Sequence, residues 1–439
     1  MSNARVRLMA LLVVVATAAA LSVGSFATAP KPVAEQAESA QRVTRSMACV
    51  TAAPGGEAVV GSLTGTMSSS TRAKGGRVAL NGVGSVLRVK SDEAAASTAF
   101  ASQSVRRGPS YAAQSCPEPS RQQWFLGTGS GRLHHSTLTL VNTRSGDAIV
   151  DVTVVGKKGE IPTAGLDDIT VGKQPVVLDL ARVAASVDTT AIGVTAVRGL
   201  VAATVTDTWA PSETSRELVE YMPAQADPTT DLTVAGLPKR YDEATLFLLN
   251  HGDAAAVVQL RLTGRRGSFA STKHRSITAP PGALTTVVLP TDVRGDVGGL
   301  RLSTDQPLSA GVRVLSDRDV TQLAALPPVG ERSVTGIPTG AKSQVWLVNP
   351  DEKSPVEADV QFVAADRKVQ RRTSVTIAPG GLISLDAPGG RGGPRAVRVD
   401  GGGAVRGVVV LQAPRGRAVL PMSSATGETR VPRVVQSLE

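Results

Sequence analysis

The sequence contains an internal repeat, and this repeat limits the possible folds more than any other feature. LTLVN ends at Asn142, LFLLN ends at Asn250 and VWLVN ends at Asn349, at intervals of 108 and 99 residues. After each asparagine, the same segments follow in the same order: turn formers, an alternating strand, two short strands around a Pro or Gly turn, and a hairpin. A repeat of about 100 residues predicts similar modules that each bury their own core.

Each repeat unit is predicted to consist of short β-strands. Segments such as AIVDVTVVG and AAVVQLRLTG alternate apolar and polar residues, as expected for strands with one buried face. With a lead-in segment such as WFLGTG, a unit contains about seven strands. This favours an all-β fold of tandem immunoglobulin-like β-sandwich modules. A β-propeller is the alternative, because the tail ETRVPRVVQ resembles the lead-in strand and could close a ring.

The repeats divide the chain into predicted modules. GSVLRVKSDEAAASTAFASQS aligns with AIGVTAVRGLVAATVTDT of the following unit, so residues 47–120 are predicted to form a degenerate module. Complete modules are expected at 121–229, 230–330 and 331–439, the last with an additional C-terminal strand. The length of 439 residues agrees with several domains rather than one core.

The N-terminus has the features of an export signal. Arg5 and Arg7 precede an uncharged apolar run from Leu8 to Ala29 that is long enough to span a bilayer. Residues 1–29 are therefore expected to be a signal peptide or a transmembrane anchor, and 30–46 a polar stalk. Pro30, directly after the small residues ATA, favours the anchor. The positive charge before the run predicts that the remaining chain is extracytoplasmic, anchored to the plasma membrane or secreted.

The chain has two cysteines, Cys49 and Cys116. In an exported protein such a pair favours a disulfide, because two thiolates without a nearby histidine cannot complete a zinc site. A bridge across this loop would stabilise the fold by about 4 kcal/mol on loop-entropy grounds. Two unpaired buried thiols are the alternative.

The repeated asparagine has a structural and a functional interpretation. Asparagine tolerates the left-handed conformation, and its side-chain oxygen can accept a hydrogen bond from the amide two residues further on. The residues after each asparagine, TRSGD, HGD and PDEKSP, are turn formers. A structural turn is therefore predicted, with a repeated ligand contact as the alternative.

A basic pair lies at the predicted hairpin tip after each alternating strand. The pairs begin 15, 15 and 18 residues after the asparagines, so equivalent loops should carry them. These are the candidate anion-binding residues: Lys157, Lys158, Arg265, Arg266, Arg367 and Lys368. If the modules stack in similar orientations, the tips form a row that faces an anionic polymer or lipid surface. The alternative is that the charged tips are only solvated.

No catalytic residue, metal site or cofactor is predicted. The sequence contains no G-x-S-x-G elbow, no H-E-x-x-H pair and no Walker loop. His134 and His135 are adjacent, so in a strand they point to opposite faces and cannot easily share a metal. Nucleic acid is not an expected partner, because basic residues are not interleaved with aromatic ones, which make up 3% of the chain.

Three features together resemble a known family: the apolar N-terminus, the segment SCPEPSRQQWFLGTGS, and turns like VWLVNP followed by strands like VTIAPGG. The chain resembles actinobacterial exported or membrane-anchored proteins of unknown function. The resemblance implies a β-rich extracytoplasmic protein linked to the cell envelope, and it supplies no catalytic residues.

Two functions are expected on these grounds. The first is a non-enzymatic envelope scaffold or adaptor that contacts anionic cell-wall polymer through the basic tips, and the net charge of +10 permits such a partner. The alternative is a partner-binding module that presents a sheet edge to an envelope enzyme or transporter. An envelope hydrolase is a more distant hypothesis, which carboxylates converging in a cleft would support.

Overall fold

The computed structural model describes residues 39–40, 44–184, 187, 189–210, 212–271, 273–290, 297–316, 319–389, 393, 395–402, 404–414, 416–424 and 429–430. The chain forms two compact units, one of residues 1–41 with 428–439 and one of residues 42–427. In the first unit, β1 (Ser39–Ala40) and β34 (Thr429–Arg430) form a short antiparallel pair. All other described elements belong to the second unit, and all of them are β-strands except the short helix α2. The all-β prediction is therefore confirmed.

The second unit consists of four modules in chain order. Module 1 contains β2 (Ser46–Val50), β3 (Gly56–Ser62), β4 (Met67–Ser69), β5 (Arg77–Leu80), β6 (Val86–Ser91), β7 (Ala99–Arg107) and β8 (Ser110–Ser115). Module 2 contains β9 (Gln122–Thr128), β10 (His134–Val141), β11 (Ala148–Gly156), β12 (Gly159–Glu160), β13 (Ile169–Val171), β14 (Val176–Asp179), α2 (Leu180–Val183), β15 (Thr190–Arg198), β16 (Ala202–Trp209) and β17 (Leu218–Met222).

The third and fourth modules repeat this arrangement. Module 3 contains β18 (Thr229–Ala235), β19 (Glu243–Asn250), β20 (Ala256–Gly264), β21 (Gly267–Ala270), β22 (Ser276–Ala279), β23 (Leu284–Val288), β24 (Val297–Ser316) and β25 (Asp319–Ala324). Module 4 contains β26 (Arg332–Gly336), β27 (Lys342–Val348), β28 (Val356–Val363), β29 (Val369–Ile377), β30 (Leu382–Asp386), β31 (Ala396–Gly401), β32 (Arg406–Gln412) and β33 (Arg417–Pro421).

Modules 1, 2 and 4 each contain two antiparallel sheets with a common strand order. In module 2 the sheets are β14-β10-β16-β17 and β12-β11-β15-β9, and in module 4 they are β30-β27-β32-β33 and β26-β31-β28-β29. In module 3, the long strand β24 belongs to both layers and joins them into one eight-stranded sheet. The core of module 2 lies between its sheets, where Leu138, Val152 and Ile192 are fully buried or nearly so. Alternation along β11 provides this burial, as the sequence pattern predicts.

The strand order differs from that of the immunoglobulin fold. In that fold, the first strand lies in the same sheet as the second. In module 2, by contrast, β9 pairs with β15, whereas β10 pairs with β14 and β16 in the other sheet. The modules therefore have two layers, as predicted, but the first strand crosses to the opposite layer.

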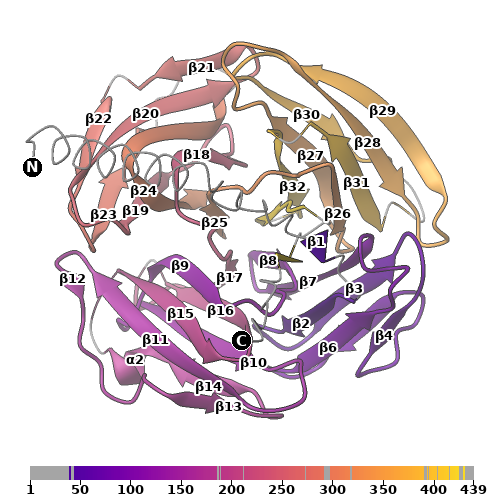
Figure 1. The fold of residues 1–439 in the computed structure, drawn as a ribbon, viewed down its shortest axis with the longest axis horizontal. Helices are drawn as coiled ribbons and strands as arrows, with labels where there is room; N and C mark the ends of the chain where they lie inside the picture. The colour runs from indigo at the N-terminus through magenta and orange to yellow at the C-terminus, as the bar shows by residue number, and fades with distance from the viewer. Residues whose placement is uncertain are drawn as a thin grey trace, which may run out of the picture. The chain divides into compact units, whose positions relative to one another are not determined.

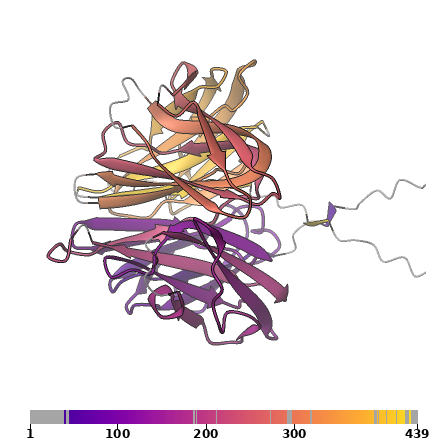
Figure 2. The same ribbon diagram turned by 90° about the vertical axis from the view of Figure 1, so that its left-hand side faces the viewer.

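The four modules close into a ring (Figures 1 and 2). The last strand of each module contacts the last strands of both neighbouring modules, in the order β8, β17, β25, β33 and back to β8. We call β8, β17, β25 and β33 the central strands. The propeller hypothesis anticipated a closed ring, but a propeller blade is a single four-stranded sheet. Here the repeated unit has two layers.

Module 1 contains the predicted disulfide, Cys49–Cys116. Cys49 lies on β2 and Cys116 directly follows β8, so the bond joins the two sheets of the smallest module. In the described part of the chain, no helix is long and apolar enough to cross a membrane. The predicted signal or anchor at 1–29 lies outside the described residues, as does most of the predicted stalk at 30–46.

Candidate functional site

The repeated asparagines have a structural role in the turns. The Asn250 side-chain oxygen accepts a hydrogen bond from the Gly252 amide at 2.9 Å, and its nitrogen donates to the carbonyls of Ala254 and Ala279 at 2.8 and 2.9 Å. Asn142 and Asn349 make the equivalent bonds, and all three are buried. Each asparagine thus joins the turn after one strand to the end of a second strand about 29 residues later. The structural interpretation is confirmed.

These turns also contact the preceding module. Arg88 of module 1 donates to the Asn142 carbonyl of module 2 at 3.2 Å. His251, directly after Asn250, lies edge-on to the Trp124 ring of module 2, with the ring centroids 5.0 Å apart. Burial lowers the pKa of His251 to about 4, so the imidazole is neutral at physiological pH. The asparagine turn is therefore also a module-to-module contact.

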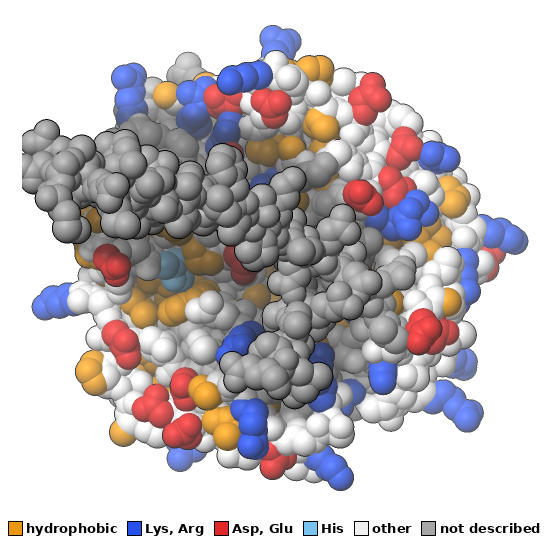
Figure 3. All heavy atoms as spheres, in the orientation of Figure 1, with side chains coloured by type: hydrophobic (Ala, Val, Ile, Leu, Met, Phe, Trp, Pro, Cys, Tyr) orange, Lys and Arg blue, Asp and Glu red, His pale blue; other side chains and the backbone are white. Residues whose placement is uncertain are grey.

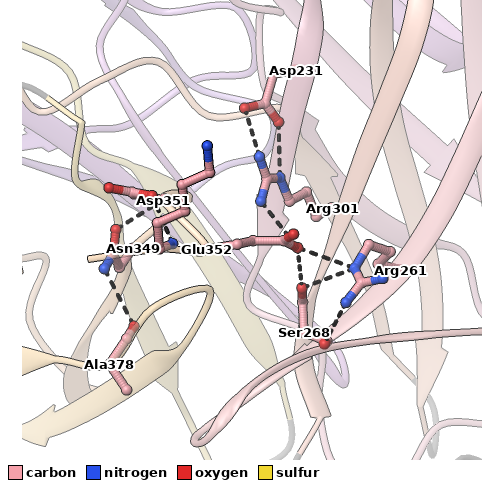
Figure 4. A network of polar contacts seen from close by, with 9 residues as sticks. Asp231, Arg261, Ser268, Arg301, Asn349, Asp351, Glu352 and Ala378 are labelled. Atoms are coloured by element: carbon pink, nitrogen blue, oxygen red, sulfur yellow. Dashed lines mark hydrogen bonds and ion pairs between the residues drawn. The ribbon is translucent and has the colours of Figure 1, made fainter. Parts of the chain in front are cut away.

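The third such contact, between modules 3 and 4, is the most polar (Figure 4). Glu352 follows the Asn349 turn, and its carboxylate accepts a hydrogen bond from Ser268 at 2.6 Å. Arg261 and Arg301 form ion pairs with the same oxygen, each at 3.1 Å. The Ser268 bond, followed by the two arginines, lowers the pKa of Glu352. Arg301 also binds Asp231, so one carboxylate of module 4 joins a network on four strands of module 3, β18, β20, β21 and β24.

The six candidate anion-binding residues all lie at exposed hairpin tips. The lysine pair joins β11 to β12, the arginine pair joins β20 to β21, and the mixed pair joins β28 to β29. These tips belong to three successive modules of a closed ring, so the linear row expected for stacked modules does not form (Figure 1). On the face in Figure 3, basic and acidic side chains are interspersed around the rim. Each pair is therefore a separate local site.

The tip of module 3 lines a hollow on the surface. Arg265, Arg266 and Phe269 line a hollow of about 790 Å³, and Phe269 is 44% exposed. No described carboxylate forms an ion pair with either arginine. The tip packs against the turn after β29, where a Cβ added to Gly381 would lie 3.0 Å from the Arg265 carbonyl oxygen. The neighbouring module therefore holds the arginine pair in place.

The other two tips differ in their contacts. Arg367 donates to the Gly65 carbonyl of module 1 at 2.7 Å, and Lys368 pairs with Asp366 at 3.2 Å. Both charges of that tip are thus partly engaged. Lys157 and Lys158 have no ion pair with any carboxylate in the described ranges. The third tip is consequently a weaker candidate for anion binding than the first two.

A basic hollow lies at the junction of modules 1 and 4, and the sequence analysis did not identify it. Arg77, Lys342 and Arg395 line a cleft of about 1200 Å³ together with Asp386. Arg77 pairs with Glu57 at 2.6 Å. Burial, and then the like charge of Arg77, lowers the pKa of Arg395. These residues are far apart in the sequence, so only ring closure brings them together.

Carboxylates are buried where the central strands meet, and the sequence analysis did not identify them. Burial, followed by the nearby Asp319, raises the pKa of Glu220 well above its usual range. Burial also raises the pKa of Asp319 to about 7, although the Arg417 amide donates to its carboxylate. Asp207 accepts hydrogen bonds from Ser136 and Gln322 and lies 3.0 Å from His134. An acidic residue within an otherwise apolar strand, as in LVEYM, is the sequence feature that could have indicated these buried carboxylates.

The chemistry of this centre is limited by burial. A hydrolase of the two-carboxylate type needs two carboxyl groups facing one cleft. Asp319 is the acidic member of a cleft of about 580 Å³ lined also by Arg240 and Arg417, whereas Glu220 is fully enclosed. Among the described residues, no group of three or more His, Cys, Asp or Glu could hold a metal ion. In the described part of the chain, Glu220 and Asp319 thus do not face one cleft, and both lie on central strands that contact one another.

Comparison with curated proteins finds no similar sequence. A family model matches residues 78–388, which extend from β5 of module 1 to the end of β30 in module 4. The match thus includes the repeated asparagine turns and all three basic tips. The chain belongs to a family of unknown function, DUF5719.

Proposed function

We propose that the protein is a non-enzymatic extracytoplasmic scaffold or adaptor of the cell envelope that contacts anionic wall polymer through its basic hairpin tips. The observation that carries the proposal is the tip of module 3. There, two exposed arginines without a carboxylate partner in the described chain line an open hollow beside an exposed aromatic ring. Guanidinium groups bind phosphate and carboxylate in a bidentate manner, and Phe269 offers a surface for a sugar ring.

The ring suits a scaffold because each junction is filled. Apolar clusters join neighbouring modules, for example Leu126 and Val155 with Phe247 between modules 2 and 3, and Val59 with Val334 between modules 1 and 4. Such contacts hold the loops of different modules at fixed separations, which lets several weak sites engage one long polymer. Multivalent attachment of this kind does not require a deep pocket.

The location is supported by the sequence and the disulfide. The basic N-terminus with its apolar run has the form of an export signal, and the Cys49–Cys116 bond is of a kind that persists outside the cytoplasm. Wall polymers that carry phosphate or carboxylate would be accessible there. A protein made with the N-terminal segment should therefore be found in the envelope fraction.

Co-sedimentation with purified bacterial cell walls tests the polymer contact. We expect the protein to bind the walls and to be released when ionic strength rises from about 0.1 to about 1 M, which shortens the Debye length from about 10 to about 3 Å. Arg265→Gln with Arg266→Gln should weaken binding about fivefold, because two exposed charges contribute about 1 kcal/mol together.

The matched control has the same charge change elsewhere. Arg72→Gln with Arg216→Gln alters two exposed arginines outside the three basic tips. This variant should sediment with the walls as the unaltered protein does. Equal binding of both double variants, or binding to walls stripped of their anionic polymer, would contradict the proposal.

A further inference from the structure

One sheet edge of module 4 is built differently from its counterparts. In modules 2 and 3, two short strands cover the equivalent position, β12 with β13 and β21 with β22. A loop separates the two strands in each case. In module 4, a single strand of nine residues, β29, takes their place and pairs with β28, with a register shift between Arg371 and Val369. The chain thus presents one long continuous edge in a position that is interrupted in the neighbouring modules.

The outer side of β29 has no strand beside it. In the described part of the chain, β29 pairs with β28 alone, and Figure 1 shows it at the outer border of its module. The residues from Val369 to Arg372 are exposed. An edge strand directs alternate amides and carbonyls outward, where they can pair with another extended chain. β29 contains no proline that would interrupt such pairing.

The positive charge near this edge favours extended chains that carry negative charge. Residues 366–377 contain four basic residues and one acidic residue, a net charge of +3. Arg371 lies 5.0 Å above the Phe362 ring, and Arg372 pairs with Asp359 at 2.7 Å. Both partners lie on β28, so these contacts hold the two guanidinium groups on the sheet beside β29. Another basic strand would be repelled there, whereas an acidic one would be attracted.

We propose that β29 is a docking edge for an acidic extended segment of a partner protein, which joins the module 4 sheet as an additional strand. Backbone hydrogen bonds would provide the affinity in this mode, and the arginines would provide the selectivity. The inference does not depend on polymer binding, because Arg265 and Arg266 lie on another module. The same arginines prevent self-association through the edge, a role that charged edge residues commonly have.

The test uses a fluorescent synthetic peptide, TEVEVET, with TKVKVKT and a backbone N-methylated TEVEVET as controls. We expect the acidic peptide to bind and to slow hydrogen exchange of the β29 amides about tenfold. The basic and N-methylated peptides should not bind. Protection elsewhere without protection in β29, or equal protection of β29 by polyphosphate, would overturn the proposal.

Two single proline variants locate the contact on the backbone. Amides of successive strand residues point in opposite directions, so of Thr373→Pro and Ser374→Pro one removes an amide from the β28 ladder and the other removes an outward amide. The ladder variant should lower the melting temperature more. The outward variant should keep the fold and lose peptide binding, and normal peptide binding by this folded variant would exclude strand addition.

A charge variant tests the proposal even if both proline variants unfold the module. Arg371→Gln with Arg372→Gln leaves the backbone intact and should weaken TEVEVET binding about fivefold through the loss of two exposed charges. Arg265→Gln with Arg266→Gln should leave peptide binding unchanged. The opposite result for these two variants would place the site on module 3 and reject β29.

Discussion

A single asparagine in each of three modules forms hydrogen bonds with backbone groups of a turn. Without it, these buried groups would be unpaired. Asn142 accepts from the Arg144 amide and donates to the carbonyls of Gly146 and Val171. In module 1, Ser62 ends the equivalent strand and donates to the Gly65 carbonyl at 3.3 Å. A hydroxyl makes fewer of these bonds than an amide can. Module 1 thus lacks part of the hydrogen bonding that the asparagine provides in the other three modules, and it contains a disulfide instead.

Asn142→Ala should lower the free energy of unfolding by about 2–4 kcal/mol, because three backbone groups lose their partner in a buried place. Denaturant unfolding measures the change. Thr143→Val is the matched control, since the buried Thr143 hydroxyl has no hydrogen-bond partner among the described atoms, and we expect it to be nearly neutral. Equal effects of the two substitutions would contradict the role assigned to the amide.

The raised pKa of Asp319, about 7, makes stability depend on pH. The folded state holds this proton more tightly than the unfolded chain, so the stabilisation is complete below the unfolded pKa and is lost as the pH rises through about 7. Between pH 5 and pH 8, we expect the unaltered protein to lose about 2 kcal/mol relative to Asp319→Asn. Asp253→Asn, at an exposed turn, is the control. Parallel melting-temperature curves for all three proteins would refute the assignment.

At the scale of elements, the sequence predicted local structure. It did not predict contacts between residues that are far apart in the chain. The strand β11 and the turn at Asn349 follow from alternation and turn chemistry, which act over a few residues. The crossing of β9 to the opposite layer has no local signal, because pairing with β15 depends on residues more than 60 positions away. The Glu352 contacts likewise join residues between 51 and 91 positions apart. Sequence spacing alone cannot indicate such contacts.

The Glu352 network should contribute modestly and depend on salt. Glu352→Gln removes the charge that faces Arg261 and Arg301, and we expect a loss of about 1 kcal/mol in unfolding free energy because the group is partly exposed. The loss should shrink at about 1 M salt, where charges are screened. Glu357→Gln, an exposed glutamate of the same module, is the control. A loss that salt does not change would argue against an electrostatic role.

At the scale of the whole molecule, ring closure places the smallest module between modules 2 and 4. β8 of module 1 touches both β17 and β33, so the first and last modules of the chain stabilise each other. The sequence indicated repeats and allowed a ring, but it did not identify the four central strands whose contacts close the ring. The sequence similarly indicated the loops that carry the candidate anion sites. It did not indicate that these loops are separated around a ring.

Removing the disulfide should therefore affect more than module 1. Cys49→Ala with Cys116→Ala should cost about 4 kcal/mol by the loop-entropy account. Because Cys116 directly follows β8, we expect faster hydrogen exchange in β8 and also in its neighbours β17 and β33. Reductant should produce the same pattern in the unaltered protein and no change in the double variant. If faster exchange stays within β2–β8, the modules unfold independently and the central strands do not couple them.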